Sequence, residues 1–199
     1  MPKREETIRD ELTEAGIAEP TLDAAFAVDA ILQKWRRRVV KRELGTRALN
    51  ELGLDLDLAQ LDALMAVWAP VNEFDDSPDG ETMVATVADR LGIDPSRASR
   101  LTADLIRLGL IRRAVSQVDG RRTILEPTDL GHEVVRAVRL YKFAALGDFL
   151  SGWTEEEVAT FLPLLDRFTT WSEQSDRFPQ HLRDRIETLR TTLPKLGET

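Results

Sequence analysis

Apolar residues recur at intervals of three to four through most of the chain, which is the period of an α-helix. The pattern predicts helices over residues 21–43, 46–52, 57–69, 129–150, 155–172 and 180–193. Residues suited to helix capping stand at the start of four of them: Thr21, Asp57 with Gln60, Thr128, and Thr154 with Glu157. Pro163 lies inside the helix over 155–172, and because proline lacks a backbone donor we expect a kink there.

Residues 83–128 depart from this pattern of long helices. Their periodicity predicts two short helices joined by a tight turn at Gly92, since glycine readily adopts the left-handed conformation. Ala88, four residues earlier, is small enough for the two helices to pack closely. Asp94 followed by Pro95 is a typical start for the second helix. The sequence therefore indicates a helix-turn-helix.

A β-hairpin is predicted directly after these helices. Residues 110–118 and 123–125 are expected to pair, and Asp119-Gly120 between them is a strong signal for a tight turn. Two helices followed by such a hairpin are typical of a winged helix-turn-helix, whose second helix enters the major groove of DNA. We therefore expect a mainly α fold with a small β-hairpin wing.

The helical period divides the second helix of this motif into two faces. The face expected inside the protein carries Ala98, Leu101, Thr102, Leu105 and Leu108. The face expected outside carries Ser96, Arg97, Ser99, Arg100 and Ala103. Arginine can bind guanine through two hydrogen bonds, serine can bind phosphates or base edges, and an alanine methyl can touch thymine. We therefore predict that the outer face contacts DNA.

The tip of the predicted hairpin adds three residues to this surface. Arg121 and Arg122 follow the turn, and arginines in such a wing can enter the minor groove, where the negative potential is strong. Asp119 is acidic at a place where DNA would approach. We expect its carboxylate either to orient an arginine or to shape the turn, and we include it with the predicted DNA-binding residues.

The net charge of the chain, −8, at first argues against a nucleic-acid partner. The position of the charges matters more than their sum, because screening limits their reach to about 8–10 Å. Residues 84–122 hold eight arginines and four aspartates, and a second basic run covers 34–42. Acidic residues gather elsewhere, five of them in the loop 73–81. The predicted DNA-binding motif is therefore a basic region within an acidic chain.

The composition is that of a folded, soluble protein. The chain has 199 residues, of which 42% are hydrophobic and 31% charged. No apolar run approaches the roughly 18–20 residues of a membrane span, and the first residues lack a secretory pattern. There are no cysteines, which excludes disulfides and thiolate metal sites. We expect a cytoplasmic protein.

No pattern in the sequence points to an enzyme, a cofactor or a metal site. The two histidines, His132 and His181, lie far apart in sequence, and there is no glycine-rich nucleotide loop. The loop 73–81 lacks the oxygen spacing and the final glutamate of an EF-hand. The alternative to DNA binding is a winged helix that serves as a protein-interaction module, because an arginine-rich helix surface is often only solvated.

The chain resembles the MarR family of bacterial winged-helix regulators. The two helices VADRLGIDPSRASRLTADLIRLGLIRR and the wing VDGRRTILEPTDLGHEV carry the resemblance. Asp119, Arg121, Thr128 and Gly131 occupy the places of the family's wing pattern. Pro127 stands where members usually have an apolar strand residue, so we expect the second strand of the wing to end early.

The resemblance implies a homodimer that binds a palindromic operator. It divides the chain into N-terminal dimerisation helices over 1–56, the winged helix-turn-helix over 57–128 and C-terminal dimerisation helices over 129–199. The sequence is consistent with this, since the helices over 21–43, 129–150 and 155–172 have wide apolar stripes that one monomer would struggle to cover. Family members commonly repress transcription and leave DNA when a small, often aromatic, anion binds.

An aromatic carboxylate would be recognised by aromatic rings and a cation. The candidate residues for such an effector are Trp35, Arg38, Trp68 and Arg112. The two tryptophans also lie on the apolar faces of predicted helices, where such residues more often belong to the core. Arg38 is equally suited to bind phosphate or to lie at the dimer surface.

Overall fold

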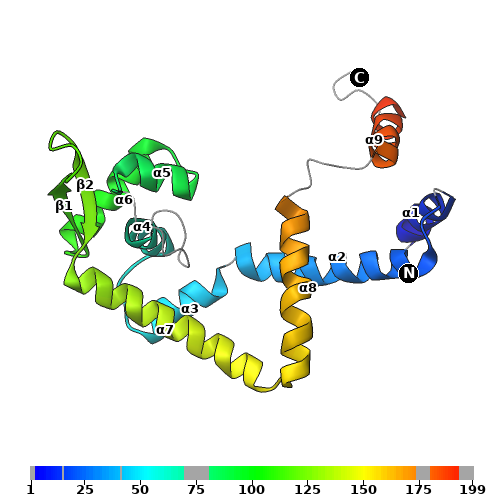
Figure 1. The fold of residues 1–199 in the computed structure, drawn as a ribbon, viewed down its shortest axis with the longest axis horizontal. Coiled ribbons are helices and arrows are strands. Elements are labelled where there is room, and N and C mark those ends of the chain that lie inside the picture. Colours follow the sequence, from blue (N-terminus) through cyan, green and yellow to red (C-terminus); the bar gives the residue numbers. More distant parts are fainter. Residues whose placement is uncertain (1–2, 15, 41, 70–80, 174–179, 193–199) are drawn as a thin grey trace. The chain divides into compact units, whose positions relative to one another are not determined.

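The computed structural model describes residues 3–14, 16–40, 42–69, 81–173 and 180–192. The helices in these ranges are α1 (Lys3–Glu14), α2 (Glu19–Val40), α3 (Glu43–Glu51), α4 (Leu58–Trp68), α5 (Val84–Leu91), α6 (Pro95–Arg107), α7 (Asp129–Ser151), α8 (Glu155–Glu173) and α9 (Gln180–Thr192). The strands β1 (Ile111–Val115) and β2 (Thr123–Pro127) form one antiparallel hairpin (Figure 1). The prediction of a mainly α fold with a hairpin wing is confirmed.

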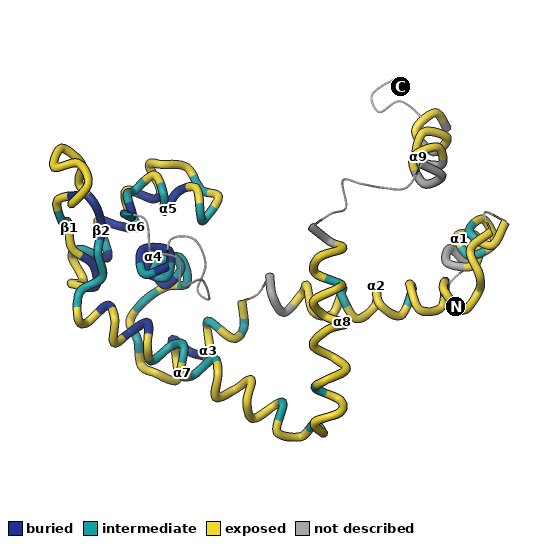
Figure 2. The backbone as a smooth tube through the Cα atoms, in the orientation of Figure 1, coloured by how far each residue is buried: buried dark blue, intermediate teal, exposed yellow. Residues whose placement is uncertain are grey.

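The chain divides into two compact units, Met1–Phe143 and Ala144–Thr199. The core of the first unit lies where α4 packs against α5, α6 and β2. Figure 2 shows buried residues concentrated in these elements and in the first turns of α7. The largest fully buried side chains are Leu64, Leu105, Ile111, Val87 and Val135. A single core therefore holds the helix-turn-helix, the hairpin and the start of α7 together.

Helix boundaries follow the predicted caps closely. Asp57 and Gln60 form the expected capping box, with Gln60 N–H donating to Asp57 Oδ1 at 2.7 Å. Thr154 and Glu157 form another at the start of α8. The first long helix begins at Glu19 instead of Thr21, and it ends at Val40. A positive φ of 51° at Arg42 separates it from α3, so the predicted helix over 21–43 is wrong at its end.

The turn between α5 and α6 has the predicted geometry. Gly92 adopts φ +60°, and the amide of Ile93 donates to the carbonyl of Ala88 at 3.1 Å. Asp94 then caps α6 by accepting the amide of Arg97 at 2.9 Å. Five residues were expected on the inner face of α6, and the prediction is wrong for one of them, Leu108. The helix ends at Arg107, and Leu108 is 41% exposed.

The hairpin differs from its prediction at both ends. Its tip is the longer loop 116–122 instead of a two-residue turn: Ser116 N–H donates to Arg122 O at 3.0 Å, and Arg122 N–H donates to Asp119 O at 2.8 Å. The second strand does not end early, because Pro127 pairs with Ile111. The next amide, Thr128 N–H, bonds Leu110 O at 3.0 Å. Antiparallel bonds alternate, so proline stands at a position that needs no donor toward β1.

The second unit begins inside α7 and continues through α8. An aromatic cluster fixes the turn between them: Trp153 lies 5.4 Å from Phe149 and 5.0 Å from Phe161, in edge-to-face arrangements. Helix α8 runs through Pro163 as one helix. Several apolar side chains of α8 are exposed in this single chain: Phe161, Leu162, Leu165 and Trp171. No helix of the described ranges is long and apolar enough to cross a membrane.

Candidate DNA interface

The outer face of α6 presents all five residues predicted to contact DNA. Ser96, Arg97, Ser99, Arg100 and Ala103 are exposed. The opposite face is anchored by Ala98, Thr102 and Leu105, which are buried against the core. The Thr102 hydroxyl donates to the carbonyl of Ala98 at 2.9 Å, so even this polar residue is satisfied inside the helix. The outer face is therefore small, polar and basic on a rigid support.

Asp94 organises the first turn of this helix. Its carboxylate accepts the hydroxyl of Ser96 and the backbone amide of Arg97. The hydrogen bond from Ser96, followed by that from Arg97, lowers the pKa of Asp94 below its ordinary value of 3.8. Asp94 is therefore ionised at neutral pH, and Ser96 is oriented before any ligand arrives. The guanidinium groups of Arg97 and Arg100 make no hydrogen bond or salt bridge to another described residue.

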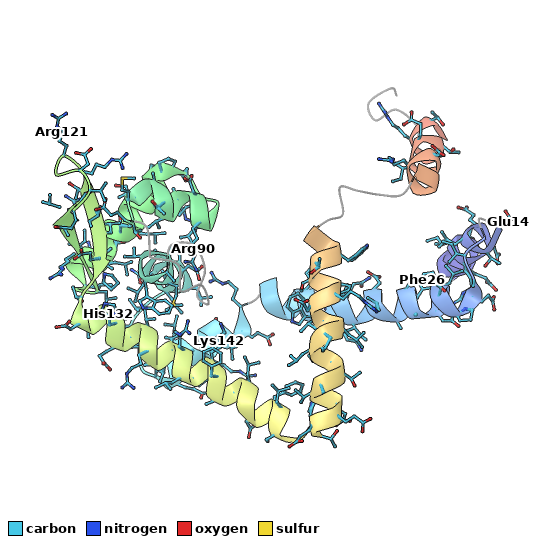
Figure 3. All side chains as sticks on the ribbon, in the orientation of Figure 1. Glu14, Phe26, Arg90, Arg121, His132 and Lys142 are labelled. Atoms are coloured by element: carbon cyan, nitrogen blue, oxygen red, sulfur yellow. The ribbon has the colours of Figure 1, made fainter. Side chains whose placement is uncertain are left out.

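The wing extends its two arginines beyond the strands. Arg121 lies at the tip and points away from the hairpin (Figure 3). The Asp119 carboxylate accepts the backbone amide of Arg121 at 3.1 Å and lies 3.8 Å from Nε of Arg122. Asp119 thus has both of the roles considered from the sequence, since it shapes the turn and orients an arginine.

Glu81 is a residue of this region that the sequence pattern did not reveal. Its side chain accepts the hydroxyl of Ser116, the amide of Gln117 at 2.7 Å and the amide of Val118 at 3.3 Å. These bonds, that from Ser116 first, lower the pKa of Glu81 below its ordinary value of 4.5. In the sequence it is only the last acid of the loop 73–81, and its partners lie more than thirty positions away. The other residues of that loop lie outside the described ones.

The candidate effector residues are not brought to one place. Trp35 lines a hollow of about 590 Å³ between α2, α3, α4 and α7, whereas Trp68 lines a second hollow of about 470 Å³ beside α7. Arg112 lies on the wing, where its guanidinium donates to Glu126 across the hairpin at 3.0 and 3.2 Å. The side chain of Arg38 lies outside the described residues.

Arg139 on α7 is the cation that the two hollows share. It lines both of them, and its guanidinium lies 4.7 Å from the centre of the Trp68 ring. The larger hollow also has three further cations on its walls, from Arg42, Arg47 and Lys142. Lys142 is labelled in Figure 3. Sequence periodicity placed Arg139 on the long helix, but only the packing of α4 against α7 distinguishes it from other surface arginines.

Comparison with known proteins finds one family model that matches part of the chain and several solved structures with the same fold. Residues 72–122 match the MarR family model. Three solved structures share the fold: RV1404 from Mycobacterium tuberculosis (23% identity, TM-score 0.58, covering 77% of this chain and 96% of that one), Streptococcus pneumoniae FabT in complex with DNA (18%, 0.56, 73% and 97%), and S. aureus MepR bound to ethidium bromide (22%, 0.52, 69% and 94%). No curated protein sequence matches the chain.

The fold and the arrangement of α5, α6 and the hairpin define a winged helix-turn-helix protein. The family match covers α5, α6, β1 and the loop at the tip of the wing, and over this part of the chain the resemblance to the MarR family seen in the sequence is confirmed. The matched family is one of transcription regulators and not of enzymes, in line with the expectation from the sequence.

Proposed function

We propose that this protein is a cytoplasmic transcriptional repressor that binds a palindromic DNA operator as a homodimer and releases it when a small molecule binds. The observation that carries the proposal is the exposed serine and arginine face of α6 beside a wing tipped by Arg121 and Arg122. An acidic chain that concentrates arginines on one exposed recognition surface has the charge distribution that phosphate binding requires. The structure of FabT with DNA supports the same use of this fold.

Within this proposal, α6 reads base edges and the wing contacts the flanking groove. The small side chains Ser96, Ser99 and Ala103 allow the helix to enter the major groove deeply, while Arg97 and Arg100 can reach guanines. Arg121 and Arg122 extend toward the minor groove. Asp119 contributes through the geometry of the wing instead of through direct attraction to DNA.

Exposed apolar side chains support the homodimer. Along α7 and α8 of this single chain, Leu140, Phe149, Leu162 and Trp171 are each more than half exposed. Large apolar side chains along two helices favour a partner surface, and a second copy of the same chain provides one. A twofold dimer would place its α6 helices about one DNA turn, ~34 Å, apart, which requires a palindromic site.

The hollow next to Trp35 supports an aromatic anion as the effector. Arg42, Arg47, Arg139 and Lys142 line it against two acids, Glu43 and Asp62. Arg42 is already paired with Asp62. MepR is known in complex with ethidium, an aromatic cation, and the excess of positive side chains here favours the opposite charge. The effector would act by binding more tightly to the dimer conformation that does not fit DNA.

Selection of bound fragments from random DNA tests the function. Repeated selection should enrich a palindrome. The logarithm of the binding constant for this palindrome should fall linearly with the logarithm of the salt concentration, with a slope of about −0.9 per phosphate contact. Recovery of no common sequence, with only weak binding, would instead favour a protein-interaction module. Aromatic carboxylates can then be tested for release of the selected DNA. Arg139→Ala should raise the carboxylate concentration required for release, whereas Arg190→Ala, on α9, should leave it unchanged.

A further inference from the structure

We propose that Glu81 is a positioning residue for DNA binding: its carboxylate clamps the start of the wing-tip loop 116–122 and so determines where Arg121 and Arg122 meet the DNA. This inference rests on the proposed function and assigns a further determinant of it. Glu81 itself makes no contact with DNA in this account. It acts through the loop 116–122.

The clamp holds three successive residues of the wing. One carboxylate oxygen of Glu81 accepts the backbone amides of Gln117 and Val118 at 2.7 and 3.3 Å. The other accepts the hydroxyl of Ser116, which is buried. Hydrogen bonds to a carboxylate are stronger than those between neutral groups, and three donors on one side chain fix its direction. The point where β1 enters the loop is therefore tied to the segment before α5.

Ser116 transmits this constraint to the tip. Its hydroxyl oxygen accepts the amides of Val118 at 3.1 Å and Asp119 at 2.8 Å. The Asp119 carboxylate in turn accepts the amide of Arg121 at 3.1 Å. A continuous path of hydrogen bonds thus leads from Glu81 through Ser116 and Asp119 to the arginine at the tip.

The neighbouring residue anchors the other strand of the wing. Leu125 N–H on β2 donates to the carbonyl of Thr82 at 2.7 Å. Glu81 and Thr82 together therefore hold both sides of the hairpin. Without the Glu81 bonds, β2 would remain anchored while the loop 116–122 would keep only its internal contacts, so the arginines would lose their fixed direction and the core would stay intact.

The negative charge of Glu81 distinguishes a positioning role from a purely electrostatic effect on DNA affinity. A carboxylate near a DNA-binding surface repels phosphate, so its neutralisation should strengthen binding if charge were its only contribution. A positioning role predicts the opposite sign. The lowered pKa of Glu81 keeps the side chain ionised at neutral pH, where all three of its bonds are available.

The test is a double-mutant cycle on the affinity for the selected operator. We expect Glu81→Ala, which removes the acceptor oxygens, to weaken binding about five- to tenfold, the effect of one or two hydrogen bonds, although it also removes a negative charge. In the Arg121→Ala/Arg122→Ala background the same substitution should change affinity less than about twofold, because the groups that it positions are gone. Asp89→Asn, which removes an exposed charge on α5 that does not contact the wing, should leave affinity unchanged or increased.

Two results would overturn the proposal. One is a Glu81→Ala protein that binds the operator as tightly as the wild type or more tightly. The other is a loss of affinity that persists in full without the two arginines, which would indicate a general structural effect. If Glu81→Ala does not fold, Ser116→Ala removes the link between Glu81 and Asp119, and the same cycle is applied to it with the same two criteria.

Hydrogen exchange on the protein alone separates the clamp from the proposed function. The amides of Gln117 and Val118 should exchange faster in Glu81→Ala than in the wild type, because alanine has no acceptor for them, while those of α4 should not change. If the wild type binds no DNA sequence specifically, the proposed function fails, yet this exchange experiment still reports whether the clamp exists. Unchanged exchange at both amides would refute the clamp whatever the DNA result.

Discussion

Gly131 and Leu110 approach so closely that a side chain at position 131 cannot be accommodated. A Cβ atom built on Gly131 would lie 2.0 Å from the carbonyl oxygen of Leu110, far inside van der Waals contact. The same carbonyl accepts the amide of Thr128 at 3.0 Å, and the Thr128 hydroxyl accepts the amide of Gly131 at 3.1 Å. The first turn of α7 is therefore packed directly onto the residue that precedes β1.

We predict that Gly131→Ala destabilises the protein by about 1–3 kcal/mol, because the added methyl forces α7 away from Leu110. Chemical denaturation gives the free energy of unfolding of both proteins. Gly147→Ala is the matched control in the same helix, since a Cβ there would meet nothing within 4 Å. It should be neutral or stabilising by up to about 1 kcal/mol, as alanine favours a helix interior over glycine. Equal stability of the two variants would contradict the close packing.

The geometry around Gly131 and Gly92 shows which features the sequence could predict. Gly92, Asp94 and the capping box at Asp57 were predicted correctly because each depends on residues within four positions of one another. The faces of α6 followed from its period for the same reason. Leu108 was placed wrongly because periodicity does not say where a helix stops contacting the core.

Features that depend on distant segments could not be read in this way. Nothing near Glu81 in the sequence indicates that its partners are Ser116 and Val118. The separation of Trp35 and Trp68 into two hollows depends on how α2, α4 and α7 pack, which no local pattern encodes. The DNA-contacting role of the α6 face remains a prediction, and it requires DNA to be tested.

Arg100→Ala should reduce the discrimination between the selected operator and single-base variants by about 1–3 kcal/mol at one position, because a bidentate contact to guanine would be lost. Affinities for the operator and its variants, measured at one salt concentration, provide the comparison. Arg107→Ala on the same helix is the control. Its guanidinium is bonded to Asp104 at 2.6 Å, and it should leave discrimination unchanged. If Arg100→Ala discriminates like the wild type, α6 meets DNA with a different face.

Asp94→Asn should make the protein less sensitive to acid. The hydrogen bond from Ser96, and then that from the amide of Arg97, lower the pKa of Asp94 in the folded state below 3.8. Its stabilising contribution is therefore present above its unfolded pKa and is lost as the pH falls through the lower folded value. Asparagine keeps a capping oxygen but does not titrate. Between about pH 5 and pH 2 the thermal midpoint of the wild type should fall further than that of Asp94→Asn. If the thermal midpoints of the two proteins fell in parallel with pH, this role of Asp94 would be excluded.

Leu165→Glu should weaken the proposed homodimer. Leu165 lies on α8 among apolar side chains that are exposed in the single chain, and it is 43% exposed itself. If a second copy covers this face, a charge placed there would be buried without a partner. The dissociation constant of the dimer should rise at least tenfold, which corresponds to about 1.4 kcal/mol. Light scattering over a concentration series would show the shift toward monomer.

Thr170→Glu is the control for this variant. It introduces the same charge on α8 at an exposed polar position about 140° around the helix from Leu165, and light scattering should still show the mass of the dimer. A wild-type protein that is monomeric at micromolar concentration would refute the dimer directly. A dimer that tolerates Leu165→Glu as well as Thr170→Glu would place the subunit interface elsewhere. Because two recognition helices must be held about one DNA turn apart, Leu165→Glu should also weaken binding to the full palindrome more than to a single half-site. That difference would connect the apolar face of α8 to the reading of DNA by α6.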